Sequence, residues 1–447
     1  MASVSRMPSS HVSTIFAPAS GFGRAAVSVI RISGPSCTSL LKAIGGTVPE
    51  PRRLSLRALR DPETREVLDR GLVVFMPAPA TFTGEDMAEL HLHGGVAVRH
   101  AVLGVLGRFP GCQAAGPGDF SRRAAFNGRL DLTQAEGIAD LVDAETEAQR
   151  RQALRQLDGA LGRQVEAWRS TAIDLYARTE AALDFADEGD VDEEGLEAGL
   201  AQDARALADS IRAALGDGRR GERLREGFFV VLAGPPNAGK STLLNALAGR
   251  EAAIVSAIPG TTRDAIEVRC DLGGLPVVLV DTAGLRETDD PVESEGIRRT
   301  RRRMEDADLV LHLSPAGEGV ASEPVSARGL AVRTKIDLTD SRSGGDSAGI
   351  GVCALSGAGL DALLEAIRAA AERSLGGSDA LITRERHRTA LTEACAHLDR
   401  VAGGAVAAPE LVAEDLRLAV RALGTVVGHV GVEEMLDRLF AGFCIGK

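Results

Sequence analysis

The residues with the most specific chemistry form the stretch GPPNAGKST, from Gly234 to Thr242. It follows the apolar run FFVVLAG and opens a helical pattern, which is the context of a phosphate-binding loop between a strand and a helix. Backbone N–H groups of such a loop face phosphate oxygens, Lys240 adds a positive charge, and Ser241 offers a hydroxyl to Mg²⁺. The stretch therefore predicts a nucleoside triphosphate site formed by Asn237, Ala238, Gly239, Lys240, Ser241 and Thr242.

Three further motifs follow in the order that is typical of a GTPase. PGTTRD occupies the place of a switch loop with a Mg²⁺-binding threonine, and DTAG ends an apolar strand where an aspartate can hold Mg²⁺ through water. TKID ends another strand, where Asp337 can accept hydrogen bonds from guanine. These motifs favour GTP over ATP. With the strand GVCALS they complete the predicted GTP contacts: Ser256, Ala257, Ile258, Pro259, Gly260, Thr261, Thr262, Asp281, Thr282, Ala283, Gly284, Thr334, Lys335, Ile336, Asp337, Cys353, Ala354 and Leu355.

Departures from the usual GTPase pattern bear on the chemistry. Thr334 stands where asparagine is usual, so we expect weaker selectivity for guanine, although Asp337 carries the main discrimination. Leu285 stands where many GTPases carry a water-orienting glutamine. Glu293 can orient water instead, and its plainer interpretation is a solvated helix residue. Asn237 can bring a carbonyl oxygen towards the phosphates and bind a monovalent cation, which would supply the positive charge of an arginine finger.

The secondary structure predicted from the sequence changes along the chain. Residues 14–125 alternate β-rich runs with turns and one helix at 96–109. Apolar residues then recur every three or four positions, and the stripe from Leu154 to Leu175 predicts one long amphipathic helix. From residue 227 the runs predict a parallel sheet with one antiparallel edge and a hairpin at Gly273–Gly274. Helical patterns return after residue 376.

This succession predicts a multidomain chain in which an α/β module interrupts a helical domain. We assign residues 1–128 to an α+β N-terminal domain and residues 226–376 to an inserted Ras-like α/β P-loop GTPase domain. Residues 129–225 and 377–447 form the two parts of an all-α helical domain, whose halves we expect to meet in space.

The composition limits the classes of protein that remain. The net charge of −12 argues against a protein that coats nucleic acid through its overall field, so contact with RNA needs a local basic patch or a partner. Six scattered cysteines predict a reducing compartment without a disulfide framework. No apolar run approaches 18 residues and the N-terminus lacks an apolar signal segment, so we predict a cytoplasmic protein without a membrane span.

Other chemistry-bearing stretches have plainer interpretations. The acidic run at 184–195 lacks metal-ligand spacing and is expected to be a solvated loop. His91 and His93 alternate on one strand face without a third ligand, so we predict no metal there. The terminal sequence CIGK fits a prenylation signal badly, because glycine is not aliphatic and lysine is not a usual last residue. From these residues alone, Cys444 remains either a terminal thiol without a role or a functional one.

The chain resembles the MnmE (TrmE) family of tRNA-modification GTPases over nearly its whole length. The resemblance is carried by RISG, TFTGEDMAELHLHGG, the inserted GTPase motifs, DTAGLRETDDPVESEGI and the terminal FCIGK. It implies homodimerisation through the N-terminal domain, which would bind 5-formyl- or 5,10-methylene-tetrahydrofolate. It also implies a heterotetramer with an FAD-containing MnmG (GidA) type partner. Together they would add an aminomethyl or carboxymethylaminomethyl group to C5 of the wobble uridine (position 34) of certain tRNAs, driven by GTP hydrolysis.

The resemblance also assigns roles to particular residues. Glu293 matches the water-orienting glutamate, which resolves the difficulty posed by Leu285. Cys444 becomes a candidate nucleophile or proton relay beside the one-carbon donor. The Mg²⁺ ligands map to Ser241 and Thr262, the potassium ligands to Asn237, Ser256, Ile258 and Thr261, and the folate contacts to Arg31, Glu89, Arg129 and Lys447. Arg129 replaces a lysine found in some members, which keeps the charge and changes the geometry.

Two rival functions remain open at this point. One is a regulatory RNA- or ribosome-binding GTPase whose additional domains only bind, which predicts no affinity for reduced folate. The other is a P-loop ATPase or kinase, which Thr334 keeps open. Comparing turnover of GTP and ATP separates the second rival from the GTP hydrolase that the motifs favour.

Overall fold

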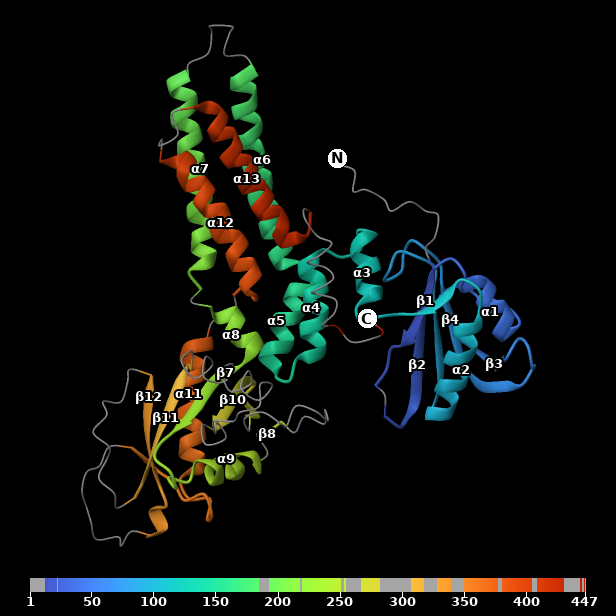
Figure 1. Cartoon of the computed structure of the whole chain (residues 1–447), viewed down its shortest axis with the longest axis horizontal. Coiled ribbons are helices and arrows are strands. Elements are labelled where there is room, and N and C mark those ends of the chain that lie inside the picture. Colours follow the sequence, from blue (N-terminus) through green and yellow to red (C-terminus); the bar gives the residue numbers. More distant parts are fainter. Residues whose placement is uncertain are drawn as a thin grey trace, which may run out of the picture. The chain divides into compact units, whose positions relative to one another are not determined.

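The computed structural model describes residues 13–21, 23–184, 193–217, 219–250, 253–254, 267–281, 307–316, 328–338, 349–376, 380–403, 408–429, 443 and 446. The chain forms two compact units. The first comprises Met1–Ala139, Gln156–Arg178 and Leu416–Lys447, and the second comprises Asp140–Arg155 and Thr179–Asp415. Figure 1 labels the helices and strands.

A six-stranded sheet forms the centre of the N-terminal domain, which confirms the α+β prediction (Figure 1). The order is β3-β4-β5-β2-β1-β6, antiparallel except for β6 beside β1. The strands are β1 (Thr14–Pro18), β2 (Ala25–Ser33), β3 (Ser55–Arg60), β4 (Val67–Met76), β5 (Met87–Gly94) and β6 (Cys112–Ala114).

The two faces of this sheet differ. Helices α1 (Cys37–Gly45) and α2 (Val96–Arg108) cover one face, where alternate residues such as Ile30, Leu90 and Phe75 are buried. Among the residues that the structure describes, α3 (Asp119–Phe126) and the loop after β4 cover the other face near β1, where Phe120 is buried. Because successive side chains of a strand point to opposite faces, one face of the sheet forms an apolar core and the other can hold polar functional residues.

The predicted long helix from Leu154 to Leu175 is wrong, because the structure has two helices there. α5 (Glu147–Leu157) ends and α6 (Ala160–Asp184) begins around Gly159, whose φ is +79°. From α4 (Leu132–Asp143), Gln134 Nε2 donates to the Leu157 carbonyl at 3.0 Å. A side chain from another helix thus gives a backbone carbonyl at the end of α5 a hydrogen-bond donor. Gly159 adopts the left-handed conformation without a steric cost because it has no Cβ.

A seven-stranded sheet forms the inserted module, and its parallel strands with one antiparallel edge confirm the α/β prediction (Figure 1). Its order is β13-β12-β11-β7-β10-β9-β8. The strands are β7 (Phe228–Ala233), β8 (Ala253–Ile254), β9 (Glu267–Leu272), β10 (Leu275–Asp281), β11 (Leu309–Pro315), β12 (Gly329–Thr334) and β13 (Ile350–Gly351). Helices α9 (Lys240–Ala248) and α11 (Leu360–Leu375) pack on one face.

The helical segments on either side of the module meet, as the sequence predicts. α7 (Glu193–Leu215) packs against α12 (Glu385–Ala402), and Arg212 donates to Asp399 at 2.8 and 2.9 Å. The entry helix α8 (Arg220–Glu226) approaches the exit segment so closely that a Cβ on Gly221 would lie 2.1 Å from the Ile382 carbonyl oxygen. The last described helix is α13 (Pro409–Val427).

Candidate functional site

The phosphate-binding loop joins β7 to α9, and its backbone explains its residue types. Gly234 lies so close to β11 that a Cβ would be 2.5 Å from the Leu313 carbonyl oxygen. Asn237 and Gly239 both have positive φ, +64° and +86°. Asparagine tolerates this conformation better than most residues and glycine adopts it freely, so the loop can turn its N–H groups inward at the start of α9.

Lys240 lies inside this loop. Its Nζ donates to the carbonyl oxygens of Gly234 at 2.8 Å and Pro235 at 3.0 Å, and the residue is buried. The ammonium group therefore already occupies the concavity that phosphate oxygens would share. This geometry suits a lysine that neutralises β- and γ-phosphate charge.

The two predicted magnesium-binding groups of the described residues lie together. Ser241, at the first turn of α9, donates from Oγ to Asp281 Oδ2 at 2.5 Å, and Asp281 ends the buried strand β10. A hydroxyl and a carboxylate supply the hard oxygen ligands that Mg²⁺ prefers. Ser241 would hold the ion directly and Asp281 through water.

The predicted guanine-binding residues lie in two neighbouring loops at the same edge of the sheet. Thr334 ends β12 and residues 335–337 follow it, while residues 353–355 come after β13, and these two strands are parallel. Thr334 is 4% exposed, and its Oγ1 donates to the Ala238 carbonyl in the phosphate-binding loop at 2.7 Å. The sequence pattern does not predict this link, because it relates the threonine at position 334 only to recognition of the guanine base. Leu355 is 86% exposed.

Several predicted residues lie outside the part of the chain that the structure describes. They are Ser256, Ala257, Ile258, Pro259, Gly260, Thr261, Thr262, Thr282, Ala283, Gly284, Glu293, Cys444 and Lys447. Their assignments stay predictions. Of the potassium ligands, the structure describes Asn237.

The N-terminal domain brings together the predicted folate residues Arg31 and Glu89, on paired positions of β2 and β5. Arg31 Nε and an Nη both donate to Glu89 Oε1 at 3.2 Å. The guanidinium carbon also lies 5.5 Å from the Phe82 ring centroid and 5.9 Å from that of Phe120. Phe120 is fully buried, so the groups that can contact a flat, polar heterocycle are the Arg31 guanidinium, the Glu89 carboxylate and the partly exposed Phe82 ring.

Arg129 reaches the same loop, since its Nε donates to the Thr81 carbonyl at 3.1 Å. Phe82 was not predicted from the sequence, although it is a lone aromatic residue within the polar motif TFTGED. An aromatic residue amid polar neighbours in a loop was the available signal.

Two described residues of the C-terminal segment pack in this unit. Phe443 is buried against Leu132 and Ala135 of α4. Gly446 has φ +99°, and a Cβ there would lie 2.1 Å from the Pro18 carbonyl oxygen at the end of β1. Because Ala17 of β1 pairs with Arg31 of β2, the segment reaches the strand beside the arginine.

The two histidines of β5 have carboxylate partners. His91 Nε2 lies 3.3 Å from Glu89 Oε2, and His93 Nδ1 lies 2.8 Å from Asp69 Oδ1. Among the residues that the structure describes, no three histidine, cysteine or acidic residues form a metal-binding group. No helix in the described ranges has the length and apolar character needed to cross a bilayer.

Comparison with known proteins covers nearly the whole chain. The family model for the GTP-binding protein TrmE N-terminus matches residues 14–129, and that for the MnmE helical domain matches residues 132–444. A tRNA modification GTPase MnmE from Methylorubrum populi is 71% identical over 436 residues, 97% of this chain and 98% of the relative. One from Rhodospirillum rubrum is 52% identical over 98% of this chain and 100% of the relative.

Solved structures resemble part of the chain. The G domain of the FeoB iron transporter from T. maritima is 26% identical with a TM-score of 0.22, covering 32% of this chain and 98% of that chain. The two family models together match most of the chain, and the relatives named as tRNA modification GTPases match it over nearly its whole length. The chain therefore belongs to the MnmE family of tRNA modification GTPases.

Proposed function

We propose that this GTPase uses potassium-activated GTP hydrolysis to drive one-carbon chemistry in its N-terminal domain. In this proposal it acts in the cytoplasm as a homodimer with an FAD-containing MnmG (GidA) type partner. The two proteins add an aminomethyl or carboxymethylaminomethyl group to C5 of the wobble uridine of certain tRNAs. The carbon comes from 5-formyl- or 5,10-methylene-tetrahydrofolate.

The close contact between Gly446 and Pro18 is the main support for folate binding. Pro18 ends β1, which pairs with β2, the strand that holds Arg31. The contact supports a pocket in which the last residues of the chain complete a surface formed by Arg31, Glu89 and Phe82, which packs against the buried Phe120. A pterin ring presents amide-like donors and acceptors around a flat π-system. A carboxylate can accept from such a ring, and aromatic faces can stack on it.

The exposed part of the sheet face supports homodimerisation. Leu56, Leu72, His91 and Val29 are successive partners across β3, β4, β5 and β2, so their side chains lie on one face. Leu56 is 68% exposed and Leu72 is 40% exposed. A second copy of this domain is the occupant that the resemblance implies, and burying these leucines would contribute apolar area to the dimer.

The residues of the nucleotide site support the proposed binding and hydrolysis of GTP. Lys240 and the loop N–H groups bind phosphate oxygens, Ser241 and Thr262 hold Mg²⁺, and Glu293 orients the attacking water. A potassium ion held by Asn237, Ser256, Ile258 and Thr261 would supply positive charge near the phosphates when bound. Asn237 adopts the left-handed conformation two residues before Gly239, and its side-chain amide oxygen is the group proposed to contribute to such a site.

Binding of a reduced folate tests the proposal against a regulatory GTPase. We expect 5-formyl-tetrahydrofolate to bind wild-type protein in equilibrium dialysis and to bind Arg31→Gln about tenfold or more weakly, because a charge-assisted contact is lost. Arg53→Gln is a matched control, since Arg53 forms an exposed ion pair with Glu50 elsewhere in the domain. Wild-type protein without folate affinity would favour the regulatory function instead.

The role of Cys444 requires its own test. If the thiol takes part in the one-carbon step, Cys444→Ser abolishes the wobble modification in cells and leaves GTP turnover in place. Unchanged levels of the modified nucleoside with Cys444→Ser would leave this thiol without a role.

A further inference from the structure

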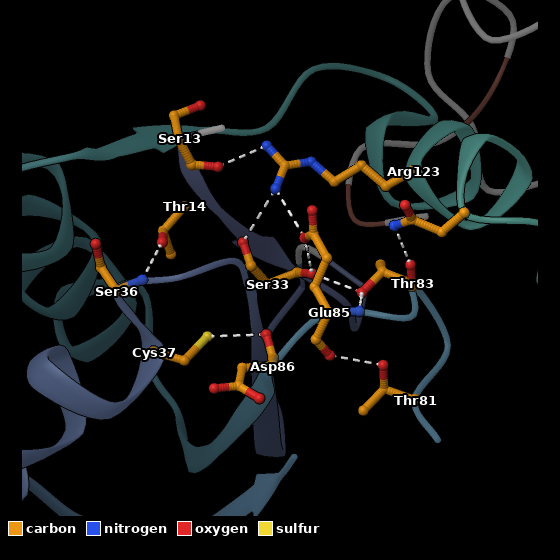
Figure 2. Close-up of polar contacts among 11 residues, drawn as sticks. Ser13, Thr14, Ser33, Ser36, Cys37, Thr81, Thr83, Glu85, Asp86 and Arg123 are labelled. Carbon is orange, nitrogen blue, oxygen red and sulfur yellow. Dashed lines mark hydrogen bonds and ion pairs between the residues drawn. The ribbon is translucent and has the colours of Figure 1, made fainter. Parts of the chain in front are cut away.

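The loop from Thr81 to Asp86 is held by a polar network that the proposed chemistry does not itself use (Figure 2). Glu85 lies at its centre. One carboxylate oxygen, Oε2, accepts from Ser33 Oγ at 2.7 Å and from an Nη of Arg123 at 2.8 Å. The side chains of Arg123 and Glu85 are 17% and 19% exposed. Both are therefore largely removed from water, where a charge-assisted bond contributes most.

Arg123 connects the loop to the rest of the domain. Its other Nη donates to the Ser13 carbonyl at 2.7 Å, directly before β1, as Figure 2 shows. Ser33 in turn contacts Thr83, with 2.7 Å between the two hydroxyl oxygens. The guanidinium thus links α3, the loop and the first two strands through one planar group.

Phe82 lies between residues whose backbone groups are fixed. Arg129 Nε donates to the Thr81 carbonyl at 3.1 Å, and Asn127 Nδ2 donates to the Thr83 carbonyl at 2.6 Å. Thr81 Oγ1 also donates to the Glu85 carbonyl at 2.7 Å, which closes the loop on itself. The loop therefore has little freedom to move Phe82, because each neighbouring carbonyl already has a donor.

The ion pair joins the two elements that carry the aromatic rings. Phe120 and Arg123 lie one turn apart on α3, and Phe82 and Glu85 lie three residues apart in the loop. Both rings contact the guanidinium of Arg31, which lies two residues before Ser33 on β2 and on the same face. Phe120 is fully buried and Phe82 packs against its cluster, so the Arg123–Glu85 pair helps to hold the partly exposed Phe82 ring beside Arg31.

We propose that Arg123 and Glu85 are positioning residues for the one-carbon pocket, which hold the partly exposed Phe82 ring beside Arg31, where it can stack on a flat heteroaromatic ligand. The inference rests on the proposed function. Neither residue touches the reacting atoms. Their effect is on the affinity for the ring-bearing ligand, because a loosened loop must be ordered again when the ligand binds.

Binding of 5-formyl-tetrahydrofolate to the full chain tests this. We expect Glu85→Gln and Arg123→Gln to weaken binding by about tenfold or more, and Arg123→Lys to recover part of the loss by keeping the charge towards Glu85. Arg108→Gln is the matched control, because it breaks the 2.7 Å pair with Asp61 elsewhere in the domain. We expect that control to keep wild-type folate affinity.

A fluorescence measurement keeps the inference testable if one variant folds poorly. The chain has a single tryptophan, Trp168, so Phe82→Trp in a Trp168→Phe background places the only indole in the loop. We expect Glu85→Gln in that background to increase quenching by iodide, because the released loop exposes the indole. Quenching that does not change would contradict the positioning role.

The outcomes separate this inference from the function on which it rests. Wild-type protein that binds no reduced folate overturns the proposed function. Wild-type binding with equal affinity in Glu85→Gln and Arg123→Gln overturns the positioning role alone. Weakened binding of equal size in Arg108→Gln would also overturn it, because the loss would then reflect general destabilisation of the domain.

Discussion

The hydroxyl of Thr334 donates a hydrogen bond to the carbonyl of Ala238 at 2.7 Å, which ties the guanine motif to the phosphate-binding loop. Both residues are buried, and Ala238 directly precedes Gly239, whose φ is +86°. The hydroxyl therefore supports the loop conformation. This geometry predicts that Thr334 contributes to nucleotide affinity, while Asp337 retains the discrimination of guanine.

Thr334→Val tests that division of roles, since it removes the hydroxyl and nearly preserves the shape. We expect GDP and GTP affinity to fall about tenfold, because the buried Ala238 carbonyl loses its donor, at a cost of about 1–2 kcal/mol. Thr334→Ser is the control and should bind close to wild type. Titration with fluorescent GTP and ATP analogues gives both affinity and selectivity. A lower preference for GTP over ATP, without loss of GTP affinity, would show that Thr334 acts at the base.

The sequence predicts the strands and the nucleotide loop well because their signals are local. FFVVLAG and PVVLVD are short apolar runs that end in motif residues, and both become buried parallel strands. The break at Gly159 was missed because it depends on Gln134 from another helix. The pairing of Phe82 and Phe120 around Arg31 was missed for the same reason, since α3 and the loop meet only in the folded domain.

Potassium dependence tests the cation argument built on Asn237. We expect GTP turnover to be many-fold faster in potassium than in sodium at equal ionic strength, because the smaller ion fits a site of carbonyl oxygens less well. Asn237→Ala should remove most of that difference. Equal rates of phosphate release in the two salts would contradict a bound potassium ion as the source of positive charge at the phosphates.

Glu293→Ala tests how the attacking water is oriented when position 285 is leucine. We expect hydrolysis to slow by on the order of 10²–10⁴, the usual scale for a group that moves a proton or orients water. Nucleotide affinity should stay near wild type, because the carboxylate is not needed to bind phosphate. Parallel measurements of binding and single-turnover hydrolysis check this. A loss of affinity matching the loss of rate would indicate a role in folding of the switch region instead.

The described cysteines predict a selective pattern of thiol alkylation. Burial raises the pKa of Cys37 to about 12 and the pKa values of Cys270 and Cys395 to about 11, and it also raises the pKa of Cys112. At pH 8 a thiol of pKa 12 is ionised in about one molecule in 10⁴, so these side chains react slowly.

We therefore expect Cys444 to be the first cysteine alkylated by iodoacetamide at pH 8, as measured by peptide mass spectrometry over time. The Cys444→Ser variant provides the control, since the fast phase should disappear with it. Faster modification of Cys37 or Cys395 than of Cys444 would contradict an accessible, reactive terminal thiol.

The proposed function has GTP hydrolysis drive the transfer of a folate-borne carbon to tRNA. The direct measurement combines the protein with its FAD-containing partner, unmodified tRNA, GTP, potassium and tetrahydrofolate carrying a ¹³C-labelled methylene group, followed by mass spectrometry of the wobble nucleoside. We expect ¹³C in the C5 substituent, and we expect this label to depend on GTP and to be lost with Arg31→Gln. A modified wobble uridine formed without the label would contradict it.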